Sequence, residues 1–319
     1  MPLDPATRAF LDKAAERTTK PRHEMTPEEA RAALEGLRAL LDDGPDLPRV
    51  EALSIPVPGG ELGGKLYLPS HAPTGLIAYF HGGGWVVGSP DVFEPLCREL
   101  AARTGCALAA VAYRRAPEHP FPGPVDDAWR TLLWLDEHRA RICRGDVPLL
   151  VAGDSAGGNL AAAVTLRARA AGGPAIAAQL LAYPVTDCDF ETQSYRDPAN
   201  QLMLTREAMG WYWDHYAPDR TRRLHSEASP LRVSDLSGLP PAVILTAEFD
   251  VLRDEGEAFA ERLSAAGVPV RSRCFDGQMH AFLMMVGLLP GSRDGLDWAC
   301  AALDDVLSAS PTNHDSQGD

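Results

Sequence analysis

The chain has 319 residues, of which 45% are hydrophobic and 23% charged, so it can form a full core and is unlike a disordered or fibrous protein. Its formal net charge of -14 at pH 7 argues against nucleic acid or an anionic membrane surface as a partner. The six cysteines are scattered without C-x-x-C spacing, which predicts reduced thiols in a cytoplasmic protein rather than a zinc site or a disulfide framework.

The first 45 residues predict helices. They contain neither the basic nor the apolar region of a signal peptide. Asp4 and Pro5 have the pattern of a helix start, and Thr26, Pro27 and Glu29 predict a second helix with a capping box. An apolar stripe at helical spacing follows, made by leucines 34, 37, 40 and 41. Because this segment precedes every strand, it must pack on a structure that the rest of the chain forms.

From residue 50 onward, strands and helices alternate. Apolar runs predict strands at 50–57, 65–68, 76–80, 107–113, 148–152, 175–183, 242–246 and 270–275. Helices are predicted at 89–105, 125–139, 160–170, 254–266 and 296–307. The alternation predicts an α/β fold, with a mostly parallel eight-stranded sheet and helices on both faces. The longest apolar stretch, near residues 281–289, is too short to span a bilayer, so we expect no membrane insertion.

Residues 187–227 interrupt this alternation. They are polar and aromatic, with one clear helix that begins after Thr205. We expect this segment to be an insertion that packs over the end of the sheet that carries the candidate catalytic residues described below.

The sequence G-D-S-A-G at residues 153–157 fits the pattern G-x-S-x-G between a predicted strand and a predicted helix. In this setting the turn must be sharp to lift Ser155 clear of the sheet. Side chains at Gly153 and Gly157 would collide with their neighbours, which glycine avoids. The N–H of Ala156 lies at a helix N-terminus and points at incoming negative charge. The pattern also occurs by chance in glycine-rich turns, but the flanking elements favour a catalytic serine.

A serine nucleophile needs donors for the oxyanion, and in an open α/β sheet these come from the carboxyl ends of strands. The sequence H-G-G-G-W at residues 81–85 directly follows the strand predicted at 76–80. Such glycines let backbone N–H groups point inward without obstruction. The candidate donors are therefore the N–H groups of Gly83, Gly84 and Ala156.

The serine also needs a base and a carboxylate that orients the base. Asp250 directly follows the strand at 242–246 and its extension, and we prefer it to Asp254, which resembles a helix-start residue, and to Glu248. Among the nine histidines, His280 lies in the loop after the last strand. The order Ser155, Asp250, His280 is the order of a Ser-Asp-His triad in this architecture.

Six segments in chain order resemble the hormone-sensitive-lipase group, or bacterial family IV, of carboxylesterases in the α/β-hydrolase superfamily. They are the segments at 81–85, 113–122, 153–158, 228–231, 250–256 and 277–280. The resemblance implies that Ser155 is the nucleophile, His280 the base and Asp250 its orienting acid, with no cofactor or metal. It implies a helical cap made by residues 1–45 and the insertion at 187–227, on a catalytic domain of residues 46–319. Arg115 stands where the family usually has leucine, and Ala281 where glycine is common.

We predict from these observations a serine carboxylesterase that hydrolyses short- to medium-chain acyl esters of small molecules through an acyl-enzyme. Trp85, Met209 and Trp213 are the candidate substrate contacts, with Met203, Trp211 and Tyr212 as further candidates; the alternative is that several of these belong to the core of the cap.

Two other functions stay open at this stage. An amidase or deacetylase would use the same triad. A non-catalytic small-molecule receptor on this fold is disfavoured, because such receptors lose the triad histidine and His280 is present. By analogy with the family, a homodimer through the edge strand at 270–275 is a candidate assembly.

Overall fold

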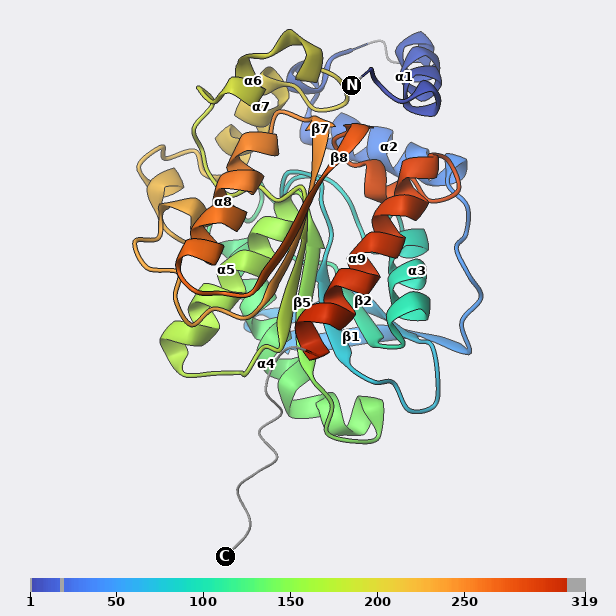
Figure 1. Cartoon of the computed structure of the whole chain (residues 1–319), viewed down its shortest axis with the longest axis vertical. Helices are drawn as coiled ribbons and strands as arrows, with labels where there is room; N and C mark the ends of the chain where they lie inside the picture. Colours follow the sequence, from blue (N-terminus) through green and yellow to red (C-terminus); the bar gives the residue numbers. More distant parts are fainter. Residues whose placement is uncertain (1, 18–19, 309–319) are drawn as a thin grey trace, which may run out of the picture.

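The computed structural model describes residues 2–17 and 20–308 (Figure 1), so residues 309–319 of the predicted catalytic domain lie outside the described part. Within that part, eight strands form one sheet in the order β1-β2-β4-β3-β5-β6-β7-β8. The strands are β1 (Arg49–Val57), β2 (Gly60–Leu68), β3 (Leu76–Phe80), β4 (Ala107–Val111), β5 (Leu149–Asp154), β6 (Ala178–Ala182), β7 (Ala242–Phe249) and β8 (Val270–Met279). β2 pairs with β1 and with β4 antiparallel, and every other pair is parallel. The predicted mostly parallel, eight-stranded sheet is confirmed.

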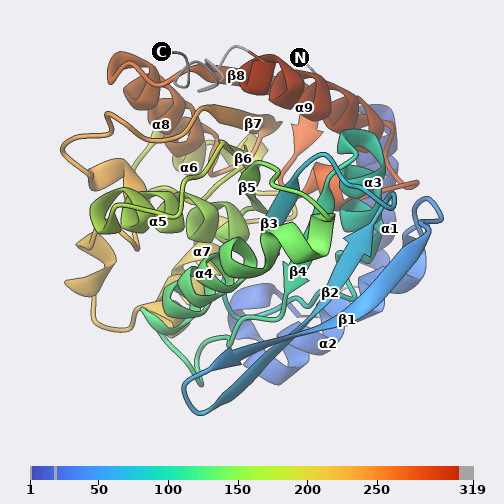
Figure 2. The same cartoon turned by 90° about the horizontal axis from the view of Figure 1, so that it is seen from below.

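Helices cover both faces of this sheet, as predicted (Figure 2). The helices are α1 (Pro5–Arg17), α2 (Pro27–Leu37), α3 (Glu94–Thr104), α4 (Gly123–Cys143), α5 (Ala156–Ala171), α6 (Gln193–Arg196), α7 (Arg206–Tyr216), α8 (Arg253–Ala265) and α9 (Pro290–Ser308). α4, α5 and α8 share one hydrophobic cluster, and α3 and α9 share another. The helices are therefore divided between the two faces.

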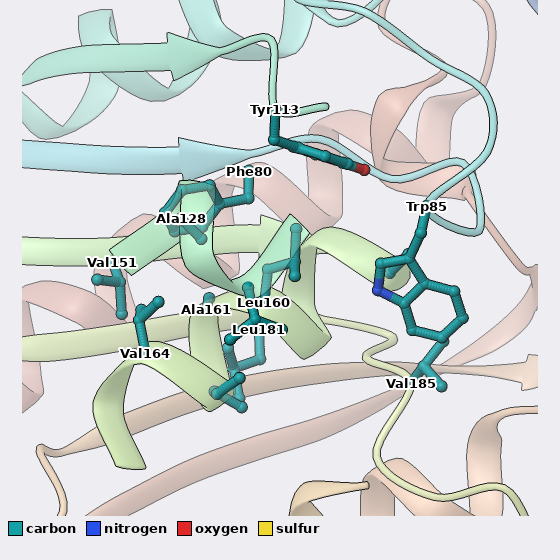
Figure 3. Close-up of a cluster of buried hydrophobic side chains, with 14 of the residues drawn as sticks. Phe80, Trp85, Tyr113, Ala128, Val151, Leu160, Ala161, Val164, Leu181 and Val185 are labelled. Carbon is teal, nitrogen blue, oxygen red and sulfur yellow. The ribbon is translucent and has the colours of Figure 1, made fainter. Parts of the chain in front are cut away.

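Strand residues alternate between these two clusters, as the pleat of a strand requires. In β3, Phe80 belongs to the cluster under α4 and α5, whereas its neighbour Tyr79 belongs to the cluster under α3 and α9. Figure 3 shows part of the first cluster, with Leu160 and Val164 of α5 lying against Val151 and Leu181 of the sheet. Because both faces are buried, the central strands are continuous apolar runs, which is why the sequence predicted them well.

Local signals fix several element ends. Thr26 accepts a hydrogen bond from the N–H of Glu29, whose side chain accepts one from the N–H of Thr26, so the predicted capping box forms at the start of α2. Thr205 caps α7 through the N–H of Ala208. Gly105 ends α3 with φ +68°, a left-handed conformation that glycine adopts at little cost. These caps agree with the predicted helix starts and ends.

Several strands are longer than predicted, and β2 differs most at its start. β2 begins at Gly60 rather than at residue 65, because the hairpin with β1 continues through the pair Ile55 and Leu62. Gly64 hid this continuation, since glycine disfavours strands. A Cβ at Gly64 would lie 2.4 Å from the carbonyl oxygen of Ala110, so the close approach of β4 requires glycine there.

The N-terminal helices and the 187–227 segment meet at one end of the sheet. Figure 1 shows α1, α2, α6 and α7 at the end to which the arrows of β7 and β8 point. The short 3₁₀ turn η1 (Arg22–Glu24) contacts α7 directly. The N-terminal segment therefore covers the carboxyl ends of the strands, where the site residues were predicted.

Of the helices in the described ranges, none combines the length and apolarity needed to cross a bilayer.

Candidate active site

Ser155 occupies a strained turn between β5 and α5. Its backbone has φ +54° and ψ -119°, a region that residues with a side chain rarely adopt. The turn is tight, because a Cβ at Gly153 would lie 2.3 Å from the carbonyl carbon of Gly157, and a Cβ at Gly157 would lie 1.9 Å from the carbonyl oxygen of Phe80. The steric reason predicted for both glycines is therefore confirmed. The Ser155 N–H donates to the carbonyl of Ala182 at 2.8 Å, which holds the strained residue in place.

The structure brings the three predicted side chains together. Nε2 of His280 lies 3.0 Å from Oγ of Ser155, and Nδ1 of His280 lies 2.7 Å from Oδ2 of Asp250. Asp250 is fully buried, and Ser155 and His280 are each 7% exposed. The buried carboxylate accepts from Nδ1–H, which leaves Nε2 to accept the serine hydroxyl proton. This is the geometry that nucleophilic acyl transfer needs.

The two competing carboxylates have other partners. Oδ2 of Asp254 accepts from the backbone N–H of Ser194 at 2.7 Å, and this bond ties α6 to the start of α8. Oε2 of Glu248 accepts from the N–H of Gly277 at 2.7 Å. Oδ1 of Asp250 accepts from the N–H of Leu252 at 2.9 Å, which fixes the carboxylate that faces His280. Asp250 alone among the three is hydrogen-bonded to the imidazole.

The glycine loop after β3 runs beside Ser155. Gly83 and Gly84 have φ values of +110° and +57°, and both line the same cavity as Ser155. The left-handed backbone turns the loop so that its carbonyl at Gly83 accepts from the N–H of Val87 at 2.9 Å. A Cβ at Gly84 would lie 2.1 Å from the ring of Tyr212, so α7 also approaches this loop closely. Only glycine fits at this position.

Asp154 joins the glycine loop to the serine turn, a role that sequence reasoning missed. It is 2% exposed, and its Oδ1 accepts from the hydroxyl of Tyr79 at 2.6 Å and from the N–H of Gly82 at 2.8 Å. Burial raises the pKa of Asp154 to about 6, and these two hydrogen bonds oppose the rise. The sequence did contain one sign of this role, which is an acidic residue at the variable position before the serine in G-x-S-x-G.

His81 starts the glycine loop and is part of its framework. Its Nδ1 lies 2.7 Å from the carbonyl oxygen of Gly82, and its ring stacks on Tyr113 with the ring centres 4.4 Å apart. Burial lowers the pKa of His81 to about 4, so the imidazole is neutral at pH 7. His81 therefore adds no charge beside the site.

A cavity of about 80 Å³ opens above Ser155. The glycine loop, η1, α2, α7 and the segment after His280 form its walls. Most of the lining side chains are apolar, and they include Leu34, Met203, Met209 and Tyr212. One guanidinium, that of Arg22, also lines the wall. A small apolar cavity beside a nucleophile is suited to a short acyl or alkyl group.

Of the three predicted substrate contacts, Met209 lies at the cavity wall, whereas Trp85 and Trp213 lie in the core behind it. Both tryptophans are fully buried and are absent from the lining. Trp85 stacks on Tyr216 with the ring centres 3.9 Å apart, and Figure 3 shows it beyond the ends of the strands. On α7, Met209 and Tyr212 face the cavity, while Trp213 and Tyr216 turn toward this aromatic core. The substrate contacts were predicted from the size of the side chains, which does not distinguish the cavity face of α7 from its core face.

The sequence and the structure are both similar to those of known esterases. A family model described as an α/β-hydrolase fold matches residues 77–284. The carboxylesterase NlhH of Mycobacterium tuberculosis is 36% identical over 290 residues, which cover 88% of this chain and 90% of that protein. An ethyl acetate hydrolase of Pseudomonas putida is 34% identical over 96% of this chain and 100% of its own length. Among solved structures, a hyperthermophilic esterase from Pyrobaculum calidifontis has a TM-score of 0.92 at 34% identity, covering 97% of this chain and 100% of that one.

Proposed function

The chain belongs to the hormone-sensitive-lipase-like carboxylesterases of the α/β-hydrolase fold, and from that premise we propose that it hydrolyses short- to medium-chain acyl esters through an acyl-enzyme on Ser155. The observation that carries the proposal is the hydrogen-bonded series from Ser155 through His280 to Asp250. His280 gives the hydroxyl of Ser155 a proton acceptor, and Asp250 gives the imidazole of His280 a fixed orientation.

In the first half of the reaction, Oγ of Ser155 attacks the ester carbonyl while Nε2 of His280 takes its proton. The imidazolium that forms is stabilised by the buried carboxylate of Asp250, 2.7 Å from Nδ1. His280 then gives the proton to the leaving alcohol, and the acyl group remains on the serine. In the second half, His280 activates a water molecule, which attacks the acyl-enzyme and releases the acid.

The tetrahedral intermediate of each half carries an oxyanion. We propose that the backbone N–H groups of Gly83, Gly84 and Ala156 bind it. Two features support this: both glycines line the cavity with Ser155, and Ala156 is the first residue of α5, where an N–H has no partner within the helix. The N–H of Gly82 is engaged by Asp154, which leaves the next two glycines for substrate. Loss of one such donor costs on the order of 3 kcal/mol of transition-state stabilisation.

The preference for short acyl chains rests on the size and walls of the cavity. Its volume of about 80 Å³ leaves little room for a long chain. Met209 is the proposed substrate contact among the three predicted residues. Trp85 and Trp213 support the wall from behind, because they pack against each other with the ring centres 4.9 Å apart and fix one side of α7.

We further propose that residues 1–45 and 187–227 act as a cap over a catalytic domain of residues 46–319. Leu34 of α2 and Met209 of α7 lie on the same cavity, which supports a joint role. Arg31 of α2 ties this segment to the catalytic domain, donating to the carbonyls of Val86 and Ala116, each at 2.9 Å.

The assembly and the location of the protein stay predictions of the sequence. β8 is an edge strand of the sheet, and its residues 271–273 are exposed, which supports the proposed homodimer through this strand. Replacing Ser272 with proline would remove a ladder donor there, and sedimentation of this variant tests the dimer. A cytoplasmic location is likewise expected from the scattered cysteines.

The proposed reaction is tested by comparing one acyl group presented as an ester and as an amide. We expect p-nitrophenyl butyrate to give a burst of one p-nitrophenol per active site followed by steady turnover, and the matching anilide to be cleaved far more slowly. Ser155→Ala should abolish both the burst and the turnover. Equal rates on the ester and the anilide would favour the amidase alternative.

A further inference from the structure

The cavity above Ser155 has mostly apolar walls, and among its lining residues Arg22 carries a positive charge that the ester reaction does not use. Arg22 belongs to η1 in the N-terminal segment, and its half-buried side chain lines the same cavity as Ser155 and the glycine loop. Its Nη1 donates to the carbonyl of Ala30 at 2.8 Å and lies 3.6 Å from the sulfur of Met25. These contacts hold the guanidinium in one position.

Arg22 has no carboxylate partner among residues 2–17 and 20–308, and its Nε and Nη2 form no hydrogen bond there. The next arginines along the chain do have carboxylate partners: Arg31 pairs with Glu118 at 2.6 Å, and Arg38 pairs with Asp43 at 2.5 Å. A guanidinium that faces an apolar cavity loses part of its hydration, and a carboxylate restores the lost interactions through two parallel N–H···O bonds.

The other charged groups of the cavity are already engaged. The carboxyl group of Asp154 accepts from Tyr79 and Gly82, and the imidazole of His280 is held between Ser155 and Asp250. The protein as a whole has a net charge of -14, so it does not attract anions over long distances. Any preference for an anionic substrate must therefore come from the local donor in the cavity.

We propose that Arg22 selects esters that carry a carboxylate at the end remote from the ester bond. This proposal rests on the proposed function, since the ester must first sit at Ser155. Arg22 is then a specificity-determining residue supplied by the N-terminal segment, which gives that segment a chemical role in addition to covering the site. Neutral esters remain substrates, but they leave the guanidinium without an anionic partner.

The test compares carboxylate esters with neutral esters of the same size. One series consists of monomethyl esters of dicarboxylic acids with four to eight carbons, each matched with its primary-amide analogue. A second series consists of O-acetyl ω-hydroxy acids and their primary amides. The first series places the carboxylate on the acyl side of the ester and the second on the alcohol side, so the series with the higher ratio identifies the side that faces Arg22.

The readout is the ratio of kcat/KM for the carboxylate ester to kcat/KM for its amide, because loosening of the cap lowers both values and leaves the ratio unchanged. We expect a ratio of at least about ten at one chain length in the wild type. The ratio should fall to about one in Arg22→Gln and be partly kept in Arg22→Lys. Arg38→Gln, which removes the same charge from the same segment outside the cavity, should leave the ratio as in the wild type.

A wild-type ratio near one in both series would overturn the proposal, and so would an unchanged ratio in Arg22→Gln. Cleavage of p-nitrophenyl acetate without cleavage of any carboxylate ester would overturn it as well. If the proposed function itself were wrong, the result would be different: esterase activity would persist in Ser155→Ala.

Discussion

Asp154 gives the sharpest test of the electrostatics beside the nucleophile. Its carboxyl group is buried, and one oxygen, Oδ1, accepts both from Tyr79 and from Gly82. In Asp154→Asn, the amide oxygen can accept the same two hydrogen bonds, while the ionisable group is gone. The substitution therefore removes a buried charge and keeps the link between the glycine loop and the serine turn.

The magnitude follows from the pKa of Asp154, which burial raises from 3.8 to about 6. Between these two values the unfolded chain has lost the proton and the folded chain still holds it, so the free energy of unfolding falls as the pH rises. The full loss is about 3 kcal/mol, at about 1.4 kcal/mol for each pH unit. Asp154→Asn avoids this loss. We therefore expect it to match the wild type at pH 4 and to be more stable by up to about 3 kcal/mol at pH 8.

Urea unfolding followed by fluorescence at several pH values between 4 and 8 measures this difference, provided that the m-value of the variant equals that of the wild type. The exposed Asp46, replaced by asparagine, is the matched control and should change the free energy of unfolding little at any pH. A difference for Asp154→Asn that is independent of pH, or a variant less stable than the wild type at pH 8, would show that the buried charge of Asp154 does not destabilise the fold.

Two further predictions use matched pairs of variants. Asp250→Asn should lower kcat by several orders of magnitude, because the imidazole is no longer held in the right tautomer. Asp254→Asn, whose amide oxygen can still accept from the N–H of Ser194, should keep kcat and lose about 1 kcal/mol of stability or less through its lost charge at the start of α8. The opposite pattern in kcat would show that Asp254 is the triad acid. Leu34→Ala should lower kcat/KM for hexanoate relative to acetate esters by roughly threefold or more, because Leu34 lines the cavity. Leu37→Ala, outside the cavity lining, should leave that ratio unchanged; an unchanged ratio in Leu34→Ala as well would remove α2 from the substrate site.

The sheet was predictable because its signals are local. β3 begins at Leu76 and ends at Phe80, as the apolar run indicated, and the capping residues Thr26 and Thr205 marked two helix starts. The sequence prediction was wrong where contacts between distant segments determine where an element ends. β8 continues to Met279 past Gly277, whose φ of +71° and whose position beside an irregular register with β7 do not appear in any local pattern.

The candidate triad was predictable because each residue directly follows a strand of the sheet, and parallel strands bring their carboxyl ends together. The cavity lining was predicted less well. Trp213 and Met209 lie on the same short helix, and only the packing of the aromatic core decides which one faces the cavity. Arg22 gave no signal, because an arginine in a polar stretch is ordinary until the fold places it at the wall of the cavity that contains Ser155.

Covalent trapping with a fluorophosphonate identifies the nucleophile of the enzyme, which we expect to be Ser155. Mass spectrometry of the labelled protein and of its peptides should show one adduct per chain on the peptide that contains Ser155. Folded Ser155→Ala should show no adduct under the same conditions. An adduct on another residue, or labelling that persists in Ser155→Ala, would show that Ser155 is not the nucleophile.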